Sequence, residues 1–235
     1  MRYPCRIAVY VVAMLAVVNS LSAQTSKAAR SAVTTAVTTK DKKMTIITAP
    51  SGANTPYVDE SAGLKTIFSN LANAYPKGLY WCCEGATISG PEAPFNIEWW
   101  HAAAFTPASA ATVERVVVSI GYLSGNDKSV ILSLDADNDG IPGTVLEQWA
   151  VTDLGEAGTC CTVQSKNSSG VALTAGQQYW IVVTTGPNSD VNASWNVADN
   201  DQIDLFLNAG LTNQNSNGWV SSPTSPNVVF AVFGQ

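Results

Sequence analysis

From about Pro56 onward, the chain is dominated by short stretches in which apolar residues recur at every second position. Within residues 112–122, one face of an extended segment would carry Val116, Val118 and Ile120, and the intervening residues would occupy the other face. This spacing predicts a half-buried strand. Further stretches of the same kind are 129–134, 144–151, 178–184, 193–197, 203–207 and 227–233.

Clusters of Gly, Asn, Asp, Ser and Pro separate these stretches, as at 124–127, 137–140 and 186–189. No amphipathic segment of usable helical length lies between the predicted strands, although residues 61–74 could form a short helix. Short strands at hairpin-like spacing favour an all-β, antiparallel β-sandwich of the jelly-roll-like kind over βαβ units. We therefore expect one β-sandwich domain over residues 56–235.

The N-terminal residues 1–23 have the features of a secretory signal peptide: basic residues at the start, an apolar run over 7–18, and a polar stretch that ends at Ala23. A membrane anchor is the alternative, but the run falls short of the ~20 residues that a membrane-spanning helix needs. Residues 24–55, rich in Ala, Thr, Ser and Lys, are expected to form a flexible leader. The sequence thus predicts a protein that is secreted or periplasmic, without a membrane span.

The chain is acidic, with 12 Lys+Arg against 18 Asp+Glu and a formal net charge of −6. The charge is unevenly divided, because residues 24–77 carry +4 whereas residues 78–235 carry −12. Proteins bind a phosphate backbone through clusters of Lys and Arg that displace counterions, so we expect no nucleic-acid partner. The basic leader is solvated, in contact with an anionic surface, or folded back on the acidic domain.

Several short motifs carry a resemblance to a known family. They are Ile-Phe-Ser-Asn-Leu at 67–71, Ala-Phe-Thr-Pro at 104–107, the segments 134–146 and 170–182, and Phe-Ala-Val at 230–232. Over residues 66–235 the chain resembles the secreted bacterial β-sandwich domains described as choice-of-anchor proteins. The resemblance implies an exported or surface-located β-sandwich and assigns no activity, because the function of that family is unknown.

Apart from Cys5 in the predicted signal peptide, the cysteines form two adjacent pairs, Cys82 with Cys83 and Cys160 with Cys161. In an exported chain an even number favours disulfides, and four cysteines permit three connectivities. Adjacent side chains of a strand point to opposite faces, which favours two bonds that each join one pair to the other. Bonds between neighbours are one alternative. A zinc site of four thiolates is another, disfavoured because adjacent cysteines diverge.

Asp135, Asp137 and Asp139 alternate ahead of a glycine, which is how a calcium-binding loop begins. The pattern then departs from such a loop, because its twelfth position is Leu146 rather than Glu and its flanks are predicted strands. The alternative is a polar hairpin turn in which Asp and Asn side chains bond the local backbone. The sequence leaves calcium open as a cofactor, and residues 199–204 form a second, weaker acidic cluster.

The chain has a single histidine, His101, and no Gly-x-Ser-x-Gly motif accompanies it. A serine or cysteine nucleophile is therefore not predicted. Glycoside hydrolysis needs only two suitably spaced carboxyl groups. No sequence feature singles out such a pair among the acidic residues.

Seven tryptophans invite a sugar-binding interpretation, because an exposed indole face stacks on a pyranose ring. Trp180 is expected in the core. Trp99 and Trp100 are adjacent, so in a strand one faces inward and one outward, whereas Trp195 and Trp219 lie in polar surroundings and are predicted to be exposed. These last four are the candidate binding residues, with core or rim packing as the alternative role for each.

Together, these features predict an exported, disulfide-linked β-sandwich that acts as a non-catalytic binding or surface-structural domain. Contact with carbohydrate, extracellular matrix or another cell-surface polymer is the leading specific hypothesis. A secreted glycoside hydrolase, or another carboxylate-based hydrolase, is the alternative.

Overall fold

The computed structural model describes residues 63–71, 81–94, 96–158, 163–197, 210–221 and 228–235. Within these ranges the regular structure is β, and no helix there is long and apolar enough to cross a membrane. The predicted signal peptide and leader lie outside the described residues. The strands are β1 (Lys65–Ser69), β2 (Trp81–Ser89), β3 (Trp99–Phe105), β4 (Ala111–Val118), β5 (Ile120–Ser124), β6 (Val130–Asp137), β7 (Pro142–Val151), β8 (Gln164–Leu173), β9 (Tyr179–Thr184), β10 (Asn192–Val197), β11 (Gly210–Gln214), β12 (Trp219–Ser221) and β13 (Phe230–Gly234).

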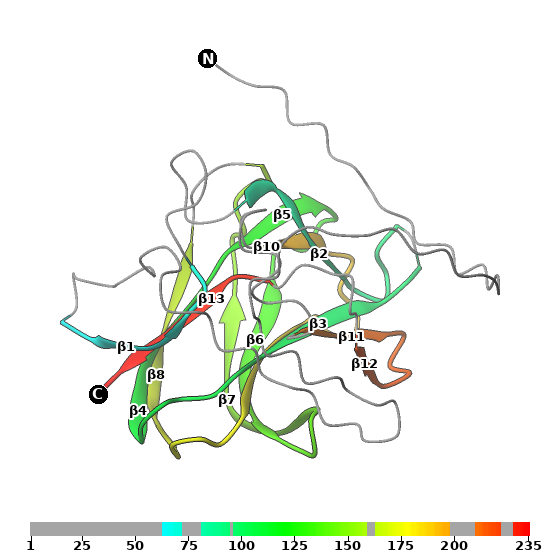
Figure 1. Ribbon diagram of the computed structural model, residues 1–235. Coiled ribbons are helices and arrows are strands. Elements are labelled where there is room, and N and C mark those ends of the chain that lie inside the picture. Colours follow the sequence, from blue (N-terminus) through cyan, green and yellow to red (C-terminus); the bar gives the residue numbers. More distant parts are fainter. Residues whose placement is uncertain (1–62, 72–80, 95, 159–162, 198–209, 222–227) are drawn as a thin grey trace, which may run out of the picture.

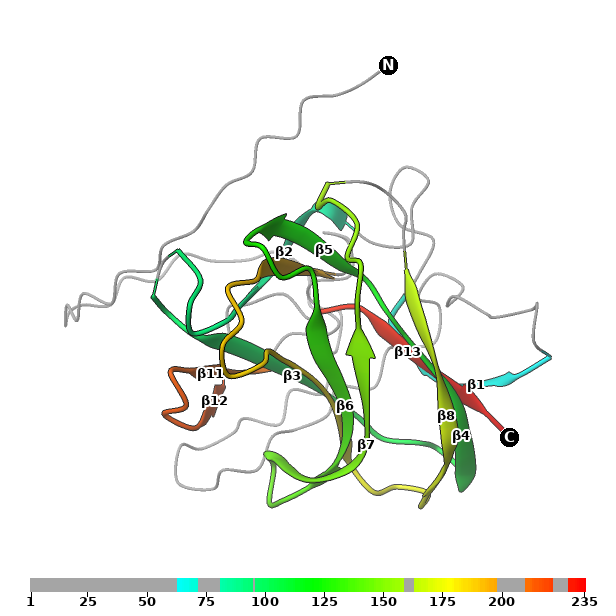
Figure 2. The same ribbon diagram turned by 180° about the vertical axis from the view of Figure 1, so that it is seen from behind.

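These strands form two antiparallel sheets that pack against each other (Figure 1 and Figure 2). The smaller sheet has the order β1-β13-β4-β8. The larger sheet has the order β5-β10-β2-β3-β9-β6-β7, and the hairpin of β11 and β12 also pairs with β3. The prediction of an antiparallel β-sandwich is confirmed.

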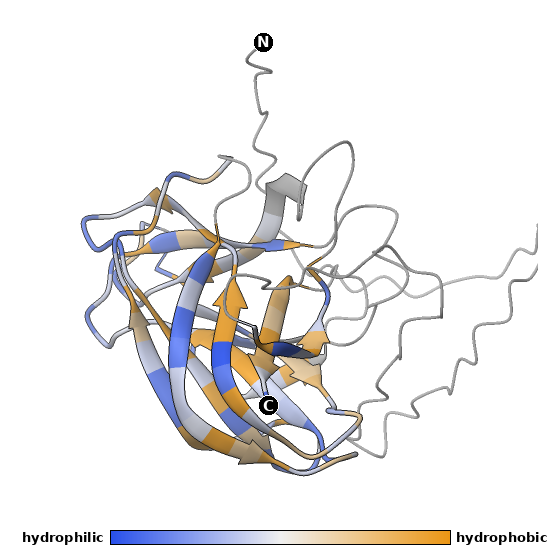
Figure 3. Cartoon of the chain, turned by 90° about the vertical axis from the view of Figure 1, so that its left-hand side faces the viewer, coloured by the Kyte–Doolittle hydropathy of each residue, from blue (hydrophilic) through white to orange (hydrophobic). Residues whose placement is uncertain are grey.

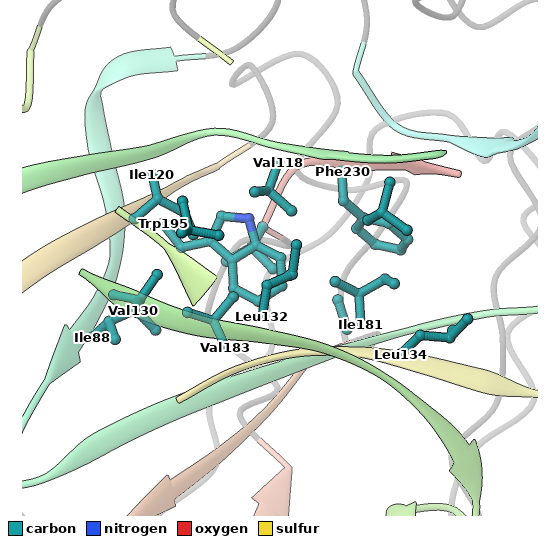
Figure 4. Packing of buried hydrophobic residues seen from close by; sticks show 14 of the residues in the cluster. Ile88, Val118, Ile120, Val130, Leu132, Leu134, Ile181, Val183, Trp195 and Phe230 are labelled. Atoms are coloured by element: carbon teal, nitrogen blue, oxygen red, sulfur yellow. The ribbon is translucent and has the colours of Figure 1, made fainter. Parts of the chain in front are cut away.

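The core lies between the two sheets and follows from the period-two spacing of apolar residues. Val118 and Phe230 of the smaller sheet face Leu132, Ile181 and Trp195 of the larger sheet (Figure 4). All five side chains are buried. Because alternate residues of a strand point to one face, the same spacing that predicts strands also supplies the apolar side of each sheet.

The predicted strand at 112–122 is divided between the two sheets. β4 belongs to the smaller sheet and β5 to the larger, with Ser119 between them. The Ser119 hydroxyl donates to Asn196 Oδ1 at 3.0 Å, and the Asn196 N–H donates to the Ser119 carbonyl at 2.9 Å. The Gln164 amide accepts from the Ile120 N–H at 2.9 Å and donates to the Ile120 carbonyl at 2.8 Å. Side-chain amides therefore hold the corner where the chain changes sheets.

The predicted short helix within residues 61–74 is wrong, because the described part of this segment contains strand β1. β1 pairs with β13, the last strand of the chain, and the Phe68 ring stacks on Phe230 with 4.8 Å between centroids. Local sequence carries no information about so distant a partner. β8 was not predicted either, because its side chains are mostly polar and exposed; its backbone pairs with β4 at the edge of the smaller sheet.

Hydrophilic and hydrophobic residues alternate along the strands (Figure 3). Even so, both sheets also bury apolar residues on the side turned away from the common core. On the smaller sheet this outer cluster contains Leu71, Val117, Val229, Ala231 and Phe233. On the larger sheet it contains Ala102, Ala104, Trp180 and Val182. The outer cluster of the larger sheet lies next to carboxylates, and there the candidate site is found.

Candidate functional site

The candidate site is the outer side of the larger sheet where β3, β9 and β6 run side by side. Residues in direct register share a face, and Ala104 pairs with Trp180, which in turn pairs with Asp135. On the other edge of β3, Trp100 pairs with Asn213, which pairs with Trp219 of β12. We call this surface the tryptophan face; it consists of Trp100, Ala102, Ala104, Asp135, Asp137, Trp180, Val182 and Trp219.

Three tryptophans from three strands therefore belong to one face. Trp180 is fully buried, as predicted, but it lies in the outer cluster rather than in the core between the sheets. Trp100 and Trp219 are each partly exposed, and Trp219 packs against the outer cluster. The Trp100 Nε1–H donates to Thr185 Oγ1 at 3.4 Å. The structure thus brings together two of the four predicted binding tryptophans and adds Trp180.

The prediction that Trp195 is exposed is wrong. Its exposed fraction is 0%, it packs in the core, and its Nε1–H donates to the Val229 carbonyl at 2.8 Å. β10 is flanked by β5 and β2, so its polar neighbours Asn192 and Asn196 are buried as well. The sequence does carry a signal for this burial, namely the apolar alternation of Ala193, Trp195 and Val197. The polar residues between them led to the wrong prediction.

Trp99 is also separated from the tryptophan face. It is adjacent to Trp100 in β3, so the two side chains point to opposite sides of the sheet, as expected from an extended segment. Trp99 shares its side with His101 and Ala103, and Ala103 belongs to the core. Trp99 is partly exposed but does not join the other candidate residues.

The acidic segment 135–139 forms the end of β6 and a tight turn. Asn138 and Ile141 exchange backbone hydrogen bonds of 2.8 and 3.4 Å, and the two residues between them have positive φ, 56° at Asp139 and 84° at Gly140. This is the type I′ geometry that favours Asp-Gly in two-residue hairpins. Asp137 Oδ2 accepts from the Gly140 N–H at 3.2 Å, as expected for a polar turn.

The turn separates the three predicted calcium ligands. Asp135 and Asp137 lie on one face of β6, whereas Asp139 is exposed at the tip of the turn. Asp137 Oδ1 accepts from Trp180 Nε1 at 2.8 Å and from Gln178 Nε2 at 2.7 Å. Across the described residues, no three His, Cys, Asp or Glu side chains are grouped so that they could hold a metal ion. The acidic cluster at 199–204 lies outside the described residues, and calcium binding stays a prediction.

Asp135 is the most unusual polar group of the tryptophan face. It is only 5% exposed, and burial raises the pKa of its carboxyl from 3.8 to about 6, against the opposing effect of a hydrogen bond from Ser133. Its Oδ1 atom is buried and has no hydrogen-bond partner within the described structure. A buried polar atom of this kind is rare and calls for an explanation. Sequence reasoning grouped Asp135 with two other acids and missed its isolation.

His101 lies on the opposite side of β3 from Trp100. Burial lowers the pKa of its imidazole from 6.5 to about 4, although a hydrogen bond with the Thr87 backbone acts in the other direction. The ring is therefore neutral at pH 7. It belongs to the core side of the sheet and not to the tryptophan face.

The predicted disulfides fall mostly outside the described residues. Cys82 and Cys83 lie in the backbone of β2, as the prediction requires for an extended segment, but their side chains are not described. Cys160 and Cys161 are outside the described ranges altogether. The two cross-links stay a prediction.

Comparisons with known proteins assign no function to this site. No known protein family matches this sequence, and no curated protein is similar to it.

Proposed function

We propose that the protein is an exported, non-catalytic binding domain that contacts carbohydrate or another extracellular polymer through the tryptophan face. The observation that carries the proposal is that the partly exposed Trp100 and Trp219 lie level with each other on either side of β11, on the face that also holds the buried Trp180 and two carboxylates. Indole rings offer apolar faces to sugar rings, and carboxylate oxygens accept hydrogen bonds from sugar hydroxyls. The basic and apolar start of the chain supports export.

The two partly exposed tryptophans are the ones to test. We expect Trp100→Ala and Trp219→Ala each to weaken polysaccharide binding by about 5-fold or more, because a truncated aromatic anchor typically costs at least ~1 kcal/mol. The measurement is a glycan array followed by a polysaccharide pull-down with the full chain. Trp149→Phe is the matched control: this tryptophan packs against the core, and its Nε1–H donates to the Asn167 carbonyl at 2.9 Å.

Unchanged binding in both alanine variants would place the site elsewhere. Failure of the wild-type chain to bind any polymer on the array would contradict the proposed function itself.

Hydrolysis is the second candidate, and one observation favours it. Asp135 and Asp137 are two positions apart on the same face of β6, and burial raises the pKa of Asp135 to about 6. Two strand residues at this spacing are ~7 Å apart at Cα, and glycosidases pair carboxyl groups about 5–10 Å apart, one of them with a raised pKa. Release of new reducing ends from a bound polysaccharide, abolished in Asp135→Asn, would establish hydrolysis and contradict a non-catalytic role.

A further inference from the structure

Trp100 and Trp219 lie in one row across three neighbouring strands. Trp100 of β3 pairs with Asn213 of β11, and Asn213 pairs with Trp219 of β12 (Figure 1). Residues in direct register point to the same face of a sheet, so the two tryptophans share the outer side of the larger sheet. Both of their side chains are partly exposed, whereas Asn213 between them is only 7% exposed. The row therefore offers two accessible indoles on either side of a short, buried side chain.

The strand order fixes the distance between these two anchors. Neighbouring strands are ~4.8 Å apart, so residues in register on β3 and β12, two strands apart, are separated by about 10 Å at their Cα atoms. A single pyranose ring is shorter than this distance, so one sugar cannot cover both indoles. In an extended β-1,4-linked chain, the repeat of two sugars has about this length. The two indoles therefore match the first and the third sugar of such a chain.

Hydrogen bonds and packing hold both ends of the row in place. The Trp100 Nε1–H donates to Thr185 Oγ1 at 3.4 Å, and Trp219 packs against the outer apolar cluster. The turn between β11 and β12 is tied to the residue that precedes β3: the Glu98 N–H donates to Asn215 Oδ1, and the Asn215 N–H donates to the Glu98 carbonyl, both at 2.9 Å. Anchors that are fixed before the ligand binds lower the entropy cost of binding.

The charge around the row disfavours a polyanionic ligand. Glu98 is two residues before Trp100, and its Oε2 atom accepts from Ser216 Oγ at 2.9 Å in the turn that precedes Trp219. The described basic residues lie elsewhere, either on strands of the smaller sheet (Lys65, Arg115, Lys166) or between β5 and β6 (Lys128). Like charges brought together at an interface are unfavourable. An uncharged chain is therefore favoured over one that carries uronate or sulfate groups.

We propose that Trp100 and Trp219 bind alternate sugar rings of an uncharged, extended β-1,4-linked polysaccharide that crosses β3, β11 and β12. The inference rests on the proposed function and narrows the polymer to one class. In a β-1,4-linked chain each sugar is turned over relative to the next, so the first and third rings lie level and present the same face to the sheet. An α-1,4-linked chain curves, so it does not keep both rings on both indoles.

Isothermal titration of the full chain with uncharged hexamers tests the linkage. The probes are the β-1,4-linked hexamers of glucose and of N-acetylglucosamine, and the α-1,4-linked hexamer of glucose. We expect at least one β-1,4-linked hexamer to bind the wild-type chain ~10-fold or more tightly than the α-1,4-linked hexamer, because only the extended chain contacts both indoles. This comparison needs no variant to fold.

The length of the ligand tests the presence of two anchors. A β-1,4-linked dimer covers one indole and the tetramer covers both, so affinity should rise by ~10-fold or more from the dimer to the tetramer of the sugar that binds. Trp100→Ala and Trp219→Ala should each abolish this rise while leaving dimer binding on the remaining indole. Val220→Ala is the matched control and should keep the rise, because Val220 is 58% exposed and follows Trp219 in β12, so it points to the opposite face.

The outcomes separate this inference from the proposed function. Equal binding of the three hexamers, or tighter binding of the α-1,4-linked one, overturns the assignment to an extended chain and leaves a carbohydrate-binding domain. Equal affinity for dimer and tetramer, or a rise that survives both alanine substitutions, overturns the pairing of the two anchors. Binding of none of the hexamers overturns the inference, and if no polymer on the glycan array binds either, the proposed function is overturned as well.

Discussion

At the scale of single residues, Asp135 stands out because its position works against stability. Most buried polar atoms are hydrogen-bonded, and a buried charge without a partner is costly. Asp135 is 5% exposed, and one of its oxygens lacks a partner in the described structure. Its neighbours Leu132 and Leu134 are core residues of the same strand, so the alternation of β6 dictates that Ser133 and Asp135 face the other way.

The first prediction concerns the pH dependence of this cost. The folded protein holds the Asp135 proton more tightly than the unfolded chain, because the folded pKa is about 6 and the ordinary value is 3.8. This favourable contribution is fully present below pH about 4 and is lost as the pH rises through about 6. We therefore expect Asp135→Asn to raise the free energy of unfolding by roughly 1–2 kcal/mol at pH 7.5 and by much less at pH 4.

Urea unfolding at the two pH values is the measurement, with Asp139→Asn as a control that should change little at either. An equal effect of Asp135→Asn at pH 4 and pH 7.5 would contradict the assignment of the buried charge to Asp135.

At the scale of elements, the position of a strand within its sheet decides what its tryptophan does. Trp195 and Trp219 both occur in polar segments. β10 is flanked by strands on both sides, so Trp195 is buried in the core. Among the described strands β12 pairs only with β11, and Trp219 is partly exposed. Pairing with neighbours is a long-range property, so composition around each residue could not separate the two.

Truncation of these two tryptophans should therefore have different effects on stability. We expect Trp195→Ala to lower the free energy of unfolding by about 3–5 kcal/mol, since it leaves a cavity in the core and removes the hydrogen bond to the Val229 carbonyl. Trp219→Ala should cost no more than about 1.5 kcal/mol, because its side chain is partly exposed. Chemical denaturation measures both, and Trp195→Phe should recover part of the loss. Similar costs for the two alanine variants would contradict the assigned burial.

At the scale of the whole molecule, the two sheets are joined by covalent continuity and by side-chain contacts along one side of the sandwich. β7, at the edge of the larger sheet, and β8, at the edge of the smaller one, are linked by Glu147, which accepts from the Ser169 N–H at 2.7 Å and from the Ser168 hydroxyl. Trp149 donates to the Asn167 carbonyl in the same region. The chain also crosses between the sheets at Ser119.

The predicted disulfides would add covalent links between distant segments of the chain. Two bonds that join Cys82 and Cys83 to Cys160 and Cys161 should make the non-reduced protein four protons lighter than the reduced protein in an intact-mass measurement. Closing a loop of ~78 residues should stabilise the fold by about 4.5 kcal/mol, less any strain, so reduction should lower the thermal midpoint clearly. A fully reduced mass in protein isolated without reductant would contradict the prediction.

The sequence by itself determined the fold class and about half of the described strands; the predicted strand at 203–207 lies outside the described residues. Period-two spacing identified the regions of β4, β6, β7, β9, β10 and β13, because the spacing of apolar residues along a strand is a local pattern. The polar hairpin turn at 139–140, one of the two interpretations of the acidic segment, was also predictable. Asp and Gly are the residue types that adopt positive φ at the two central positions of such a turn.

The tertiary structure alone decided which residues share a surface. Trp100, Asp135, Trp180 and Trp219 lie on different strands, and only the order of β6, β9, β3, β11 and β12 brings them to one face. The same order buries Trp195, whereas the turn that follows β6 separates Asp139 from Asp135. The spacing of apolar residues within a strand depends on residues that are close in the sequence, whereas the order of strands in a sheet depends on pairing between distant segments. For this reason the β-sandwich could be predicted from the sequence and the tryptophan face could not.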